Sequence, residues 1–114
     1  MRCLPLALAA LLAATPVIAH HGWGSYDATQ TLTVEAPLAA VHYRNPHVEV
    51  EIQHDGRAWN AVLAPVSRMQ SRGLPGDALR VGRTVTIVGY PRSDGAAELR
   101  AERIVVDGKS VELR

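Results

Sequence analysis

Apolar and polar residues alternate with a period of two from about Thr31 onward. This period is typical of strands that bury one face. The pattern is clearest from His47 to Gln53, where the residues expected to point into a core are Val48, Val50 and Ile52. His47 then lies on the opposite face with Glu49 and Glu51, where its ring is available to a ligand.

Further strands are expected in five segments, which are 31–43, 58–63, 83–90, 98–106 and 111–113. Pro37 indicates a bend or an edge position within the first of them, because proline cannot donate a hydrogen bond to a neighbouring strand. Asp-Gly pairs favour tight turns between strands, since both residues tolerate a positive φ. Three such pairs occur, at 55–56, 94–95 and 107–108.

One segment changes to a helical period. Val66 and Met69 are spaced for one face of a helix, Pro65 suits its first position, and Gly73 suits the residue just past its end. Three strands, a short helix and two or three further strands match a small five-stranded Greek-key barrel of the OB type. We therefore expect an all-β fold. A β-sandwich with one helix is the alternative, because both folds have the same alternation.

The residues before this β-rich region indicate export. Arg2 gives a positive start, residues 4–14 form a short apolar stretch, and Val17-Ile18-Ala19 is a small-residue cleavage site. These features are typical of a secretory signal peptide over residues 1–19. A transmembrane helix needs about 20 apolar residues, and the mature chain has no such segment. We expect residues 20–114 to form a single OB-like β-barrel domain, located in the periplasm or secreted.

Composition narrows the classes of function. The only cysteine, Cys3, leaves with the signal peptide, so no disulfide stabilises the mature chain. Without Arg2 the basic and acidic residues balance at 11 each. The basic residues do not cluster, which argues against nucleic acid as a partner. The sequence also lacks the nucleophile and phosphate-loop motifs of common enzymes.

Cleavage after Ala19 would place His20 at the amino terminus, followed by His21. A terminal histidine offers two nitrogen donors, the α-amine and the ring Nδ1, and the amine has a reference pKa of about 7.7 to 8.0. Such donors suit Cu(II), Ni(II) or Zn(II), with copper as the leading ion. Alternatively, His21 could chelate through the amine, the intervening amide and its own ring. The competing interpretation is a frayed terminus without a physiological metal.

Two further histidines could complete a site. His42 and His47 flank Asn45-Pro46, a turn expected to bring together the strand ends that carry them. The candidate metal ligands are therefore His20, His21, His47 and His42. Otherwise His47 is a surface histidine beside two carboxylates, and His42 is a strand residue bonded to backbone. Packing of Trp23 would order the terminus and favour the metal site.

The sequence 20–23, His-His-Gly-Trp, together with Asn45-Pro46-His47 and the segment 82–86, resembles a known group. It is similar to the small exported bacterial proteins of domain-of-unknown-function family 6152, an uncharacterised family. The chain departs from their usual pattern at Ala36-Pro37 and at 80–83, positions that affect strand shape. The resemblance implies no activity, but it places His20, His21 and His47 within the recognisable signature.

Two functions are therefore expected as alternatives. The first is a periplasmic metal-binding protein that carries or stores a metal ion, with copper as the leading candidate. The second is an OB-type accessory module that docks a periplasmic or membrane protein, or a glycan, with no metal role. A copper oxygenase is less favoured, because 95 residues leave little room for a broad substrate surface.

Overall fold

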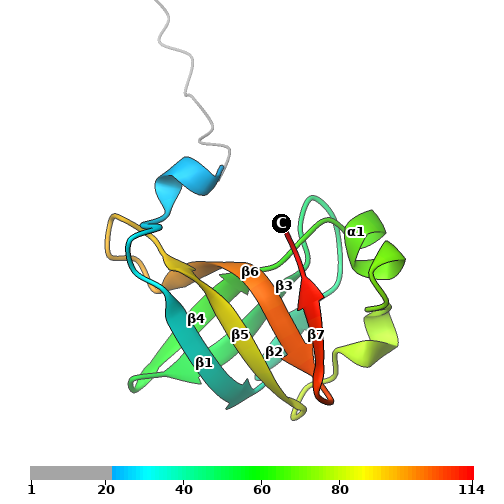
Figure 1. Cartoon of the computed structure of the whole chain (residues 1–114). Coiled ribbons are helices and arrows are strands. Elements are labelled where there is room, and N and C mark those ends of the chain that lie inside the picture. The colour runs from blue at the N-terminus through cyan, green and yellow to red at the C-terminus, as the bar shows by residue number, and fades with distance from the viewer. Residues whose placement is uncertain (1–21) are drawn as a thin grey trace, which may run out of the picture.

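The computed structural model describes residues 22–114, whose strands curl into a small barrel (Figure 1). The strands are β1 (Leu32–Pro37), β2 (Ala40–His42), β3 (Glu49–His54), β4 (Arg57–Val62), β5 (Thr84–Pro91), β6 (Glu98–Val106) and β7 (Lys109–Glu112). One α-helix, α1 (Val66–Ser71), and two 3-10 helices, η1 (Trp23–Ser25) and η2 (Gly76–Ala78), complete the described part of the chain.

The strand order explains the curled shape. The path runs β1-β5-β6-β4-β3-β2, and β7 pairs with β6 beside this path. β1 and β2 stand at its two ends, yet only Leu38 and Ala39 separate them in sequence. Counted together they form one bent strand, so the path has five strands and curls back on itself. The expected all-β fold with a small barrel is confirmed, and the short strand expected at the end of the chain is present as β7.

The bend after Pro37 is the point at which the first strand changes partners. Leu38 donates its N–H to the carbonyl of Arg83 at 2.9 Å, on the β5 side. Ala39 donates to the carbonyl of Glu51 at 2.8 Å, on β3. The bend expected from Pro37 is thus confirmed, and its role is to connect two neighbours of one barrel.

The core fills the inside of the barrel as the alternation predicts. Val48, Val50 and Ile52 are each 0% exposed. On β5, Gly89 lies at an irregularity in the pairing with β6. A Cβ at Gly89 would come within 2.2 Å of the backbone oxygen of Arg100. Glycine therefore lets β5 approach β6 closely at the strand position that carries Arg100.

Turns and helix follow the sequence with small shifts. Asp55 and Asp107 have φ values of 49° and 50°, and each is followed by a glycine that also has positive φ. Pro65 is the residue before α1 rather than its first residue, because its ψ of 149° is extended. Among residues 22–114, none of the helices has the length and apolar character needed to cross a membrane.

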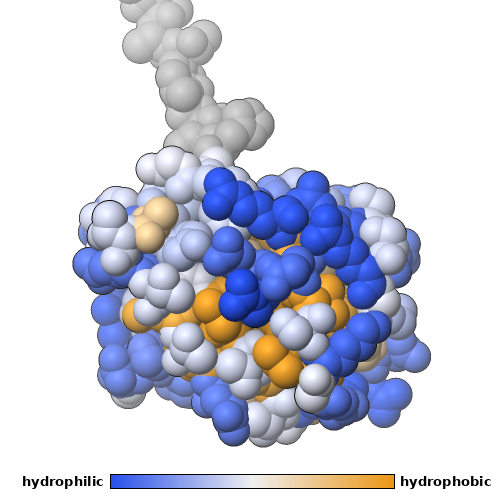
Figure 2. Space-filling view, viewed as in Figure 1, coloured by the Kyte–Doolittle hydropathy of each residue, from blue (hydrophilic) through white to orange (hydrophobic). Residues whose placement is uncertain are grey.

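Arg68 of α1 and Arg72, the residue that follows α1, contact the C-terminal end of β7. Arg72 donates through Nη1 to the carbonyl of Glu112 at 2.7 Å, and Arg68 donates through Nη1 to the carbonyl of Leu113 at 3.1 Å. The short helix is thereby connected to the last strand. The face shown in Figure 2 has apolar side chains divided by polar and charged ones. Within residues 22–114, Val81 is the one large apolar residue that is exposed to solvent, with 67% of its surface accessible.

Candidate functional site

Arg100 on β6 is the centre of the candidate site. Among residues 22–114, Arg100 is the one charged residue that is buried, and 6% of its surface is exposed. Its guanidinium carbon lies 4.8 Å from the ring centroid of Trp23. Its Nη2 lies 3.4 Å from the Nε2 of His47. One side chain therefore connects the N-terminal segment to the loop between β2 and β3.

Trp23 packs against several groups at once. Besides Arg100, the guanidinium of Arg114 lies 4.5 Å from its ring centroid. Tyr90 meets Trp23 edge to face, with the ring centroids 6.2 Å apart. Cations over an indole face are attracted by its π-electrons. Trp23 is therefore packed against Tyr90 of β5, Arg100 of β6 and the C-terminal Arg114.

The segment that follows Trp23 is fixed to the same end of the barrel (Figure 1). Tyr26 is 5% exposed and donates through its hydroxyl to Oε2 of Glu98 at 2.8 Å. Burial, and then this bond, raise the pKa of Tyr26 well above its ordinary value. The N–H of Asp27 donates to the carbonyl of Pro91 at 2.8 Å. The N-terminal segment thus has a defined path over β5 and β6.

His47 lies half-buried in the loop that enters β3. Backbone bonds hold the next residue, because Val48 donates to the carbonyl of Ala64 at 2.7 Å and accepts from the N–H of Leu63 at 2.8 Å. Asn45 accepts a hydrogen bond from the N–H of Val66 at 3.1 Å, which connects the loop to the start of α1. The position of His47 therefore depends on both β4 and α1.

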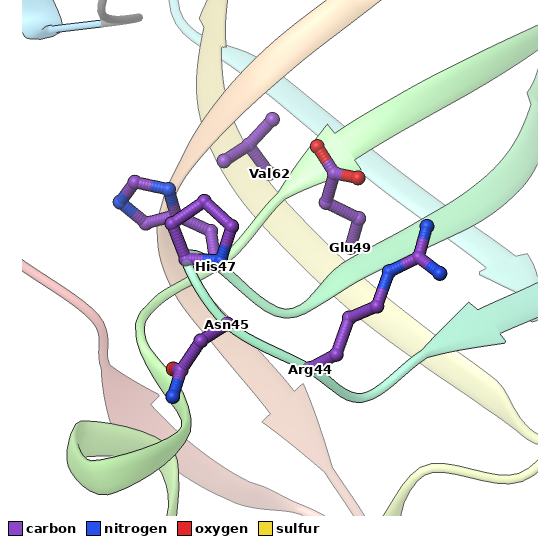
Figure 3. Close-up of a pocket in the computed structure, with 6 residues that line it drawn as sticks. Arg44, Asn45, His47, Glu49 and Val62 are labelled. Carbon is purple, nitrogen blue, oxygen red and sulfur yellow. The ribbon is translucent and has the colours of Figure 1, made fainter.

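A hollow of about 180 Å³ opens beside this loop. Its lining comes from the loop and the adjacent ends of β3 and β4, and consists of Arg44, Asn45, Pro46, His47, Glu49 and Val62. In Figure 3 the side chains of Arg44 and Glu49 extend to one side of the loop, and His47 lies on the other. The hollow offers a cation, a carboxylate and an imidazole over an apolar floor.

The structure describes two of the four predicted metal ligands, His42 and His47. His20 and His21 lie outside the described residues. His42 is exposed at the end of β2, opposite Glu49 in the β2–β3 pairing, and it does not line the hollow. Within residues 22–114, no three histidine, cysteine, aspartate or glutamate side chains converge as a metal centre would require.

The family model described as "Family of unknown function (DUF6152)" matches residues 8–100. The chain belongs to this family. A comparison with curated proteins gives no match. The DUF6152 match includes Trp23, His47 and Arg100, and it ends before Arg114.

Sequence reasoning missed two central residues of this DUF6152 chain, Glu98 and Arg100. Glu98 accepts bonds from Tyr26 and, at 3.3 Å each, from the Nδ2 of Asn60 and the Nη1 of Arg92. Both residues look like ordinary solvent-facing positions of an alternating strand. The sequence feature that could have indicated them is their position on the outer face of β6, a face that the N-terminal segment could cover. That covering depends on tertiary packing, which alternation does not encode.

Proposed function

We propose that this DUF6152 protein is an exported metal-binding protein that carries copper in the periplasm or outside the cell. The proposed ligands are the α-amine and ring of His20 together with His47, and His21 or His42 as a further donor. The supporting observation is the series of contacts from His47 through Arg100 to Trp23. The side chains of Trp23 and His47 thus lie beside the same guanidinium.

Position 20 lies three residues before Trp23, and three residues of extended chain reach about 10 Å. The proposal requires this stretch of chain to turn toward His47, so that both residues can bind one ion. An amine with two imidazoles is a donor set suited to Cu(II).

Processing must come first, because the proposed amine exists only after cleavage. N-terminal sequencing of the exported protein should give His20 as the first residue. Cleavage elsewhere would remove the terminal amine from His20 and contradict the proposed ligand set.

Copper binding itself is tested on the signal-cleaved protein. Calorimetry and electron paramagnetic resonance should show one Cu(II) site with nitrogen ligands. We expect His47→Ala to weaken binding by at least roughly tenfold, since loss of even an outer-shell partner costs about that much. His54→Ala is the matched control, because His54 lies at the other end of β3, against Trp59 at 5.7 Å between ring centroids.

A variant in which the terminal amine is moved away from His20 provides an independent test of the proposed ligands. An additional residue before His20 moves the amine away from the ring and should weaken Cu(II) binding. Micromolar or weaker binding that is unchanged in His47→Ala would refute the metal function.

The hollow favours a second candidate function, an OB-type accessory module. OB barrels commonly bind ligands at the strands and loop that correspond to β3, β4 and the loop before β3, and the hollow lies there. A partner recovered by crosslinking in cells equally well with metal-free and metal-loaded protein, and lost in Glu49→Lys, would support this function. Recovery that required His47 and copper would instead support the metal function.

A further inference from the structure

The contact between Arg100 and His47 fixes the state of one ring nitrogen. A guanidinium has only donors and keeps its charge in proteins. The Nε2 of His47, 3.4 Å from Nη2 of Arg100, must therefore be the acceptor. It follows that Nε2 carries no proton, and in the neutral ring the proton resides on Nδ1.

The same lone pair is what a metal would need. A metal bound at Nε2 cannot share that nitrogen with an N–H donor, and its charge would repel a guanidinium. Resting on the metal-binding function above, we propose that Arg100 is a positioning residue that competes with the metal for the Nε2 of His47. Metal binding then displaces the guanidinium of Arg100 from His47.

The surroundings of Arg100 determine what this displacement does. Burial lowers the pKa of Arg100 most, Arg68 lowers it further by repulsion, and the carboxylate of Glu98 raises it by attraction. The Trp23 ring lies 4.8 Å from the guanidinium carbon. A guanidinium that leaves His47 therefore changes its stacking on Trp23. The metal-free state is stabilised by a contact that the loaded state lacks, which favours release and thus carriage over storage.

A pair of substitutions tests the competition. Arg100→Met keeps the length of the side chain but removes the donor and the charge, so the affinity for Cu(II) should rise about tenfold, the equivalent of one typical hydrogen bond. Arg114→Met is the matched control: Arg114 also lies over Trp23, at 4.5 Å, whereas the nitrogen of His47 is contacted by Arg100. Its affinity should stay within about twofold of that of the unchanged protein.

Two readouts use the protein without a change at Arg100. Long-range ¹H–¹⁵N correlation spectra should show the Nδ1–H form of His47 in the metal-free protein, and Zn(II) should shift the Nε2 resonance. In a Trp59→Phe background Trp23 is the only tryptophan. Under excitation selective for tryptophan, Zn(II) should change its emission because its cation contact is altered. Zn(II) is the probe here, since Cu(II) quenches tryptophan directly.

The outcomes distinguish a failure of the competition between Arg100 and the metal from a failure of the metal-binding function. If His47→Ala abolishes binding but Arg100→Met binds no more tightly than Arg114→Met, the competition is wrong and the metal function stands. A proton on Nε2 of His47 in the metal-free protein would also overturn the competition. If His47→Ala binds as well as the unchanged protein, the metal function itself fails.

Discussion

The hydrogen bond between Tyr26 and Glu98 is central to the packing of the N-terminal segment. The hydroxyl of Tyr26 is buried on a carboxylate that also receives Asn60 and Arg92. Hydrogen bonds to charged groups stabilise more than neutral ones, and a buried acceptor that loses its donor is costly. This bond therefore contributes to holding Trp23 over Arg100.

We expect Tyr26→Phe to lower the free energy of unfolding by about 1 to 2 kcal/mol. Tyr90→Phe is a matched control, because Tyr90 donates to Glu102 at the same 2.8 Å from a more exposed position. Tyr90→Phe should lower the free energy of unfolding by less, because water can replace the hydrogen bond to Glu102. Urea denaturation followed by circular dichroism measures both variants. Equal effects would show that burial of Tyr26 adds nothing.

Asp94 gives the protein a dependence on acid pH. The bonds from Arg92, and then the N–H of Ala96, lower the pKa of Asp94 to about 2. An unfolded aspartate titrates near about 3.9. Because the folded pKa is the lower one, the interaction stabilises the fold above about pH 4 and is lost as the pH falls toward 2.

Asp94→Asn should therefore flatten the loss of stability between pH 4 and 2. Urea midpoints measured across this window test it. A variant as acid-sensitive as the unchanged protein would show that Asp94 is not responsible.

At the scale of elements, the close approach of β5 and β6 depends on Gly89. In Gly89→Ala the new Cβ would meet the backbone oxygen of Arg100 at 2.2 Å and the Cα of Ala101 at 2.9 Å. Neither backbone atom can move without disturbing the pairing. We expect a loss of about 2 to 3 kcal/mol in the free energy of unfolding, as for other overpacked sites.

Gly24→Ala is the control for this prediction, because a Cβ there meets nothing within 4 Å. Urea unfolding should place it within about 0.5 kcal/mol of the unchanged protein. An equally stable Gly89→Ala would mean that the two strands separate easily. The position of Arg100 would then be less constrained than the pairing suggests.

The elements were predictable where local chemistry decides them. Alternation marks β3 because Val48, Val50 and Ile52 face one core, and the Asp-Gly pairs adopt the positive φ that their turns require. The contacts of the candidate site were not predictable in this way. Trp23 and Arg100 come from opposite ends of the chain and meet only because β5 and β6 carry the N-terminal segment. His47 was recognisable as a candidate from the sequence, and Arg100 beside it was not.

At the scale of the whole molecule, β7 stands beside the closed path, pairing only with β6. The carbonyls of Glu112, its last residue, and of Leu113, the residue after it, accept hydrogen bonds from Arg72 and Arg68. We expect the double variant Arg68→Gln and Arg72→Gln to form more dimers and aggregates, because unprotected strand edges pair with one another. Light scattering after size-exclusion chromatography measures this. Arg80→Gln, a change elsewhere on the surface, should leave the protein monodisperse.

These two arginines have a consequence for the order in which the chain is made. Synthesis proceeds from the N-terminus, and Arg68 and Arg72 precede β7 in the sequence. The two cations that bind the carbonyls at the end of β7 are therefore already present when that strand is made.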